Sequence, residues 1–251
     1  MPYGQFSSDG LEYIIQTPNL PRPWTNYLTN ETYCAIISQC AGGYSFYKDC
    51  RTNRITRWLP ENRHLDRPGR YIFVREEKRY YSLTYQPLRI NPQFYECRHG
   101  LGYTTIETIN HGLHSKISYF VPAQDECEVW LIQLDNKTKK DKKLELFPYV
   151  EFLIGDYHEE LRYRNIMTLY NRFWFDEQSQ AVFAKKTAMW QDMNIQPFDT
   201  LIFFASSLPA AGCCTRKLEF LGPYNTEERP RAVLENQFKN FHFTSGEEGI
   251  G

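Results

Sequence analysis

The chain has 251 residues, with 29 lysines and arginines against 30 aspartates and glutamates, and a formal net charge of −1 at pH 7. This balance argues against a protein that binds nucleic acid or an anionic membrane through an excess of positive charge. The length suits one large all-β domain or two small ones. Aromatic residues make up 16% of the sequence, which favours β-strands and also provides flat surfaces for sugar rings.

The seven cysteines are irregularly spaced and form no CxxC pair. No apolar run follows the opening "MPYGQFSSDG", and no stretch approaches the roughly 20 apolar residues that a membrane-spanning helix needs. We therefore expect reduced thiols, several of them acting as small core residues, a cytoplasmic location and no membrane partner.

Taken in chain order, the predicted elements are mostly strands, because short apolar or alternating runs are separated by Asp, Asn, Pro and Gly. The runs that predict strands are 11–17, 33–40, 44–49, 70–76, 78–87, 104–110, 115–122, 128–136, 143–154, 172–176, 181–190 and 200–207. Many short strands and weak helical periodicity predict an all-β fold, a large antiparallel β-sandwich with one or two short helices.

Residues 128–154 predict one long hairpin whose turn carries five lysines. The turn has two interpretations, a solvated loop tip or a basic binding patch. No aromatic residues interleave with the lysines, which favours the loop tip.

Residues 156–172, "DYHEELRYRNIMTLYNR", are the best candidate for a helix. Asp156, Glu159 and Glu160 lie at its start. They fit the first turn of a helix, where negative charge is favoured, and they also fit an acid and base pair for glycoside chemistry. The sequence leaves both interpretations open.

Motifs for common catalytic sites are absent: the sequence contains no GxSxG, GxxxxGK[ST] or HExxH, and no GxGxxG after a strand. His111 and His114 lack a third metal ligand nearby, so we expect no metal site. The most unusual polar stretch is "ECRHGLGYT" (96–104), in which Gly100 and Gly102 permit a tight bend. We expect Glu96 to pair with Arg98 there.

Several segments together resemble the N-terminal part of the inverting disaccharide phosphorylases of glycoside hydrolase family 94, which act on cellobiose, chitobiose, cellodextrin or laminaribiose. The segments that carry the resemblance are "YGQF", "EYIIQTPNLPRPWTNYL" (12–28), "AGGYSFYKD" (41–49), "RITRW" (54–58), "DRPGRYIFVR" (66–75), "ECRHGLGYT" (96–104), "YFVP" (119–122) and "FLGPYN" (220–225). They occur in the family's order and span nearly the whole chain.

The resemblance implies that residues 1–251 form a single N-terminal sandwich domain of the galactose-mutarotase-like type, the supersandwich. In the family an (α/α)6 barrel follows and carries the general acid, so no catalytic residue is expected in this chain and its own enzymatic activity is uncertain. The implied reaction transfers a glycosyl group from a β-linked, glucose-type disaccharide or oligosaccharide to inorganic phosphate, without metal or organic cofactor. The implied partners are that barrel, in the same or another chain, and a second copy, since the family forms homo-oligomers.

The resemblance also suggests site residues. Arg164 and Asn165 match a family stretch that reaches the sugar, although the residues around them differ, so the identity of the disaccharide stays open. An alternative for Arg164 is a surface ion pair with Glu160, four residues earlier. Five residues are expected at an interface or cleft wall: Tyr44, Phe46, Tyr47, Arg98 and His99.

Two other functions compete with a role in assembling such a phosphorylase. Aromatic platforms with arginine and asparagine donors would suffice for a stand-alone carbohydrate-binding module. A mutarotase-type epimerase would need a histidine and a glutamate for proton transfer, and no such arrangement stands out in the sequence.

Overall fold

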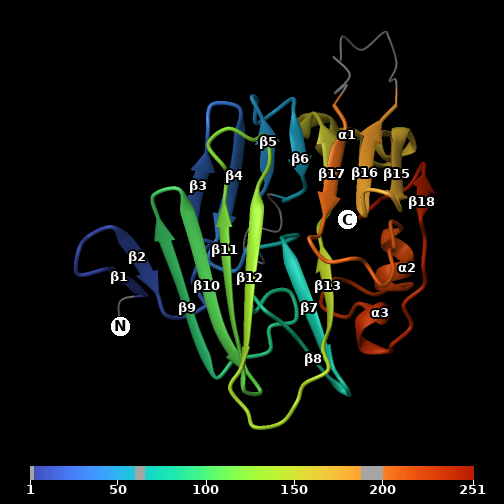
Figure 1. The fold of residues 1–251 in the computed structure, drawn as a ribbon. Helices are drawn as coiled ribbons and strands as arrows, with labels where there is room; N and C mark the ends of the chain where they lie inside the picture. Colours follow the sequence, from blue (N-terminus) through green and yellow to red (C-terminus); the bar gives the residue numbers. More distant parts are fainter. Residues whose placement is uncertain (1–2, 60–65, 188–199) are drawn as a thin grey trace. The chain divides into compact units, whose positions relative to one another are not determined.

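The computed structural model describes residues 3–59, 66–187 and 200–251 (Figure 1). The chain divides into two compact units. Unit 1 comprises Met1–Lys48 and Trp58–Pro148, and unit 2 comprises Asp49–Arg57 and Tyr149–Gly251. Antiparallel strands are the main regular secondary structure of the described residues, which confirms the predicted all-β class. The assignment of all 251 residues to a single domain stays a prediction.

Unit 1 contains a six-stranded antiparallel sheet in the order β1-β2-β9-β10-β11-β12. Its strands are β1 (Gly4–Phe6), β2 (Glu12–Ile15), β9 (Phe94–Gly100), β10 (Tyr103–Asn110), β11 (Leu113–Phe120) and β12 (Val129–Asn136). The other strands of unit 1 are β3 (Thr25–Thr29), β4 (Tyr33–Ser38), β5 (Ser45–Tyr47), β7 (Tyr71–Glu76), β8 (Arg79–Ser82) and β13 (Glu145–Tyr149), whose last residue belongs to unit 2.

One face of the six-stranded sheet forms core. Ile15, Cys97, Ile106 and Ile117 are aligned across four neighbouring strands and all are fully buried. Because successive side chains of a strand point to opposite faces, the residues beside them face away from this core. The alternation in the sequence therefore fixes the register of the sheet. Cys97 is one of five buried cysteines, as predicted for small core residues.

Side-chain hydrogen bonds join this sheet to the segment of β3 and β4. The Asn26 amide donates to the carbonyl oxygens of Gly100 (2.8 Å) and Tyr103 (2.9 Å), at the β9–β10 turn. A His99 ring nitrogen lies 3.2 Å from the Trp24 carbonyl oxygen. The Asn26 bonds hold β3 against the β9–β10 turn.

The prediction of one long hairpin over residues 128–154 is wrong. β12 pairs with β11 at the edge of the six-stranded sheet, whereas β13 pairs with β7 in the three-stranded sheet β13-β7-β8. The loop that joins β12 to β13 is largely exposed. The lysine-rich stretch is thus a connection between two sheets, and its length is what allows the chain to change sheets.

Unit 2 contains a four-stranded antiparallel sheet in the order β17-β16-β15-β18 and the antiparallel strand pair β6–β14. The strands are β6 (Arg54–Thr56), β14 (Phe152–Gly155), β15 (Asn171–Asp176), β16 (Ala181–Lys186), β17 (Ile202–Ala205) and β18 (Phe243–Ser245). Of the predicted strand over 181–190, positions 188–190 lie outside the described residues. The helices are α1 (Tyr157–Met167), the 3-10 helix η2 (Thr168–Tyr170), α2 (Lys217–Leu221) and α3 (Arg231–Leu234).

The predicted helix over 156–172 corresponds to α1 followed by η2, and β15 begins at Asn171. Tyr163 has non-helical backbone angles (φ −134°, ψ 29°), so α1 is kinked immediately before Arg164. In the part of the chain that the structure describes, no helix is long and apolar enough to cross a membrane.

Candidate functional site

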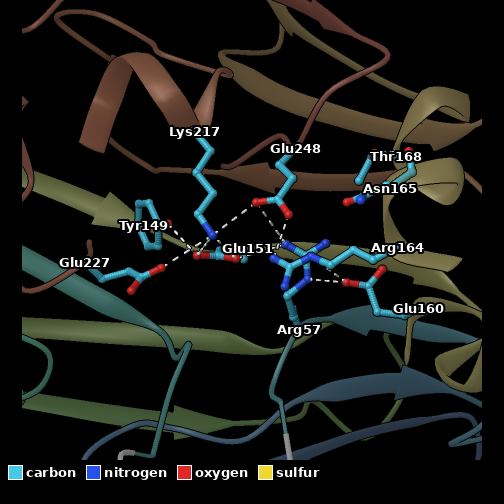
Figure 2. Close-up of polar contacts among 10 residues, drawn as sticks. All are labelled: Arg57, Tyr149, Glu151, Glu160, Arg164, Asn165, Thr168, Lys217, Glu227 and Glu248. Atoms are coloured by element: carbon cyan, nitrogen blue, oxygen red, sulfur yellow. Dashed lines mark hydrogen bonds and ion pairs between the residues drawn. The ribbon is translucent and has the colours of Figure 1, made fainter. Parts of the chain in front are cut away.

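The main concentration of buried charge in unit 2 lies beneath α1, and Figure 2 shows it in close-up. We call it the Arg57 cluster. It consists of Arg57, Glu151, Glu160, Arg164, Lys217, Glu227 and Glu248. These residues come from segments far apart in the sequence, so the cluster ties the elements of unit 2 together.

Arg57 and Glu151 form the buried centre, and both side chains are 1% exposed. Arg57 directly follows β6, Glu151 directly precedes β14, and the backbone N–H of Arg57 donates to the Glu151 carbonyl oxygen (2.8 Å). The same pairing brings Arg57 Nη1 to 3.0 Å from Glu151 Oε2. Strand pairing and ion pairing therefore reinforce each other.

Lys217 supplies the second cation for Glu151. Its Nζ lies 2.8 Å from Glu151 Oε1, 3.2 Å from Glu248 Oε2 and 3.4 Å from Glu227 Oε1. The Tyr149 hydroxyl donates to Glu151 Oε1 at 2.7 Å. A buried carboxylate needs such partners, because an unpaired charge away from water is very costly.

Arg164 connects the cluster to α1. Its Nη2 lies 2.6 Å from Glu248 Oε1, and its Nε lies 3.4 Å from Glu160 Oε1. Glu160, in turn, lies 2.8 Å from Arg57 Nε. The ion pair with Glu160 that the sequence offered as an alternative for Arg164 is therefore present, and Glu248 adds a second, closer one.

Burial and charge act in opposite directions on these groups. Burial alone would raise the pKa of Glu151, but Lys217 and Arg57 hold it well below its usual range. Burial alone would lower the pKa of Arg57, but the negative charges of Glu160, Glu151 and Glu248 outweigh burial and raise this pKa above its usual value. The pKa of Glu227 is raised by burial and by the nearby charge of Glu151.

Four carboxylates therefore face three cations in the cluster. Glu227 and Glu151 are hydrogen-bonded to each other through their side chains. Lys186, which is also buried, adds a further positive charge that interacts with Glu160. With its charges paired internally, the cluster suits a rigid support better than a catalytic acid and base.

Asn165, the second predicted sugar-binding residue, is exposed on α1, and its backbone carbonyl oxygen accepts from the Thr168 hydroxyl (3.1 Å). Figure 2 shows Asn165 and Thr168 apart from the ion pairs. The Arg164 side chain is 32% exposed. The structure thus places the two predicted residues next to each other, with Arg164 anchored and Asn165 facing solvent. Their role in sugar binding stays a prediction.

The acidic residues at the start of α1 serve the helix itself. Asp156 is its N-cap, and its carboxylate accepts from the backbone N–H groups of His158 (2.7 Å) and Glu159 (3.1 Å). Glu160 is engaged by Arg57. Of the two interpretations of this acidic group, the helix start is the one that these contacts support.

In unit 1, the stretch 96–104 forms the end of β9, the turn and the start of β10. Arg98 pairs with Glu96 (2.7 Å), as predicted, and also with Glu12 (2.7 Å). His99 Nδ1 lies 2.9 Å from the Thr104 hydroxyl, and burial lowers the pKa of His99 to about 4. These contacts give Arg98 and His99 a structural part in the turn, while their place at an interface stays a prediction.

The three aromatic residues predicted at an interface are half-buried in unit 1. The Tyr44 ring stacks on Trp58 with a centroid distance of 6.2 Å and lies 6.1 Å from Phe46, and Lys48 Nζ lies 4.7 Å above the Tyr47 ring. The preceding Gly43 has φ +100°, a backbone conformation that glycine adopts readily and other residues do not. The interface role of these rings also stays a prediction.

Sequence reasoning missed most of the Arg57 cluster because its members are scattered along the chain. Two signals were present. Glu151 lies in the otherwise apolar, strand-like run "PYVEFLI", and Arg57 is followed directly by Trp58 and Leu59 in "RITRWL". A charge in such a run indicates a buried ion pair, but the sequence does not show which charges meet.

A family model described as "Glycosyl hydrolase 94, supersandwich domain" matches residues 11–247. The chain belongs to this family. The match covers both units, so the resemblance that the sequence motifs indicated is confirmed.

Curated relatives of the supersandwich chain include two enzymes named as phosphorylases. This chain is 32% identical over 246 residues to N,N'-diacetylchitobiose phosphorylase of Vibrio proteolyticus. It is 30% identical over 241 residues to 3-O-beta-D-glucopyranosyl-beta-D-glucuronide phosphorylase of Paenibacillus borealis. These matches cover 96% and 94% of this chain. A further relative is the cyclic beta-(1,2)-glucan synthase NdvB of Rhizobium meliloti, 27% identical, with 92% of this chain and 8% of that protein covered. The chain spans about 30% of the length of the two phosphorylases.

Proposed function

We propose that this chain is the supersandwich part of an inverting β-glycoside phosphorylase that transfers a glycosyl group from a β-linked disaccharide to inorganic phosphate. Its role would be to assemble with a helical barrel, in the same or another chain, and to shape one wall of the sugar site. Support comes from the family match over most of the chain and from relatives named as phosphorylases that are about three times as long.

One observation carries the assignment of α1 to that wall. Leu161, Tyr163, Ile166 and Leu169, on α1 and η2, are 41–57% exposed, although they are large and apolar. Exposed apolar groups of this kind are typical of surfaces that another protein body covers. Asn165 lies among them, and the Arg57 cluster fixes the other side of the helix.

The proposal includes a division of roles between Arg164 and Asn165. Glu160 and Glu248 orient the Arg164 guanidinium, which limits the conformational entropy lost when it binds a ligand. Its charge is already compensated by these two carboxylates, which favours an uncharged sugar hydroxyl over phosphate as its ligand. Asn165 adds a neutral donor and acceptor.

A chimera tests this proposal. The corresponding first part of the Vibrio proteolyticus phosphorylase is replaced by this chain, and phosphate-dependent release of sugar 1-phosphate from diacetylchitobiose is measured. We expect activity in the chimera, and a loss of about tenfold in kcat/KM for Arg164→Gln and Asn165→Ala, since a hydrogen bond to a ligand contributes about 1 kcal/mol or more. Lys139→Gln, in an exposed loop of unit 1, is the matched control.

An active chimera in which neither variant differs from the control would refute the role of α1. If the chimera is inactive, association is measured directly by analytical ultracentrifugation of this chain with the separately produced remainder of the relative. No association at tens of micromolar would refute the assembly role. A homo-oligomeric state and a cytoplasmic location belong to the same proposal, and light scattering of the assembled protein tests the first.

A further inference from the structure

A polar pocket of about 370 Å³ lies in unit 1, where three connections meet. They are the β7–β8 turn, the β10–β11 turn and the loop between β12 and β13. The charged residues that line the pocket are Glu76, Glu77, Arg79, Lys140, Asp141 and Lys142, and its remaining lining residues are His111 and Thr138. The volume falls within the range of about 300–1,000 Å³ that small-molecule sites occupy.

The buried part of the pocket wall is an ion pair. Lys142 Nζ lies 2.5 Å from Glu76 Oε1, and the side chains of Lys142 and Glu76 are 8% and 13% exposed. Glu76 Oε2 has no hydrogen-bond partner among the described residues. The wall is therefore held in place by charge pairing and retains a buried acceptor without a donor.

His111 is also held in place. It has φ +49° in the β10–β11 turn, and its ring centroid lies 5.6 Å from that of Tyr81, which is fully buried. Glu77, Arg79, Lys140 and Asp141 are exposed and surround the buried pair. A fixed wall surrounded by longer, solvated side chains is an arrangement that a ligand could enter without unfolding the loops.

The lining limits the kind of ligand. Three cations face three carboxylates, so apart from His111 the formal charges cancel, and neither a phosphate nor a cation is favoured. The lining has no aliphatic or aromatic side chain other than the His111 ring, which disfavours an apolar ligand. Closely spaced strong donors and strong acceptors suit hydroxyl groups, because each hydroxyl both donates and accepts.

We propose that this pocket binds an uncharged, polyhydroxylated ligand of mono- or disaccharide size. The site lies within unit 1, whereas α1 and the Arg57 cluster lie within unit 2. The proposal therefore does not rest on the role of Arg164 or on a barrel. It assigns a second sugar-binding site to the chain, one that operates in the 251-residue protein by itself.

The test is binding to the 251-residue chain, measured by calorimetry and by ¹H–¹⁵N NMR, with cellobiose and diacetylchitobiose as probes. We expect dissociation constants in the millimolar range and shifts of the Gly112 and Thr138 amide signals. The double variant Arg79→Gln/Lys140→Gln should weaken binding at least fivefold. The control Lys139→Gln/Lys143→Gln also removes two positive charges, but from exposed positions that do not line the pocket, and should leave sugar binding unchanged.

Several results would overturn the proposal. They are no binding of either sugar at 20 mM, an equal effect of the two double variants, or tighter binding of inorganic phosphate than of sugar. If Arg164→Gln loses sugar binding and Arg79→Gln/Lys140→Gln keeps it, the sugar site would be assigned to α1 instead. Circular dichroism of each variant checks the fold. Because the chimera assay does not depend on this pocket, failure here leaves the phosphorylase proposal standing.

Discussion

Replacing Arg57 by alanine gives a direct test of how the Arg57 cluster stabilises unit 2. Among the described residues, the variant leaves Glu160 with one ion pair, the 3.4 Å contact to Arg164, while Glu151 keeps Lys217 at 2.8 Å. Removing one partner of a buried ion pair costs about 3–5 kcal/mol, most of it from the charge left behind. Because one of the two buried carboxylates keeps a close cation, we expect the lower end, about 3 kcal/mol, or more than a hundredfold in the unfolding equilibrium constant.

The assay is urea unfolding at pH 7, followed by far-ultraviolet circular dichroism and by tryptophan fluorescence. Lys137→Ala is the matched control, since it breaks an ion pair with Asp135 whose side chains are both 56% exposed. Exposed pairs contribute about 0–1 kcal/mol, so its midpoint should hardly change.

A second variant separates the destabilisation caused by the unpaired buried charge from the destabilisation caused by lost packing. Arg57→Met combined with Glu160→Gln removes the cation together with the carboxylate that it would leave unpaired, and should recover at least half of the loss. A loss below about 1 kcal/mol for Arg57→Ala, or no recovery in the double variant, would refute the reasoning, because buried charge would then not dominate the effect.

Three further predictions concern pH and backbone geometry. The pKa of Glu151 is lower in the folded protein than its ordinary value of 4.5, so the stability that Glu151 contributes is present above pH 4.5 and is lost as the pH falls below 4.5. Glu151→Gln should therefore make the free energy of unfolding depend less steeply on pH in this acidic range. Burial lowers the pKa of His99 from 6.5 to about 4, so its contribution is present above pH 6.5 and is lost between 6.5 and 4; an NMR titration in which its ring signals shift near pH 6.5 would contradict this. Gly43→Ala should destabilise the protein by several kcal/mol in urea unfolding, because a Cβ there would lie 2.0 Å from the Ile36 carbonyl oxygen, whereas Gly10→Ala, with φ +73° and nothing within 4 Å, should cost only about 1 kcal/mol.

The strands of the fold were predictable because apolar and polar residues alternate along the corresponding stretches of sequence. The aligned set Ile15, Cys97, Ile106 and Ile117 shows why: each strand carries its own pattern, and the patterns agree across the sheet. The partner of a strand was harder to predict. Residues 128–154 read as a hairpin because both runs are apolar and the loop is polar, yet β12 and β13 belong to different sheets.

The site was predictable only where it is local. Asp156 as a helix cap and the pairing of Arg98 with Glu96 follow from short spacings. The contact between Arg164 and Glu248 spans more than 80 residues and has no sequence signal. Long-range ion pairs depend on the fold, so they become visible only once the strands are in place.

The placement of 49–57 within unit 2 has a consequence for dissecting and folding this protein. A gene cut after position 148 would give two polypeptides, neither of which contains all of unit 2, because Arg57 would stay behind with unit 1. During synthesis, Arg57 emerges 94 residues before Glu151. Its charge must remain in water until that distant acid arrives, so closing this contact should be a late and slow step in folding.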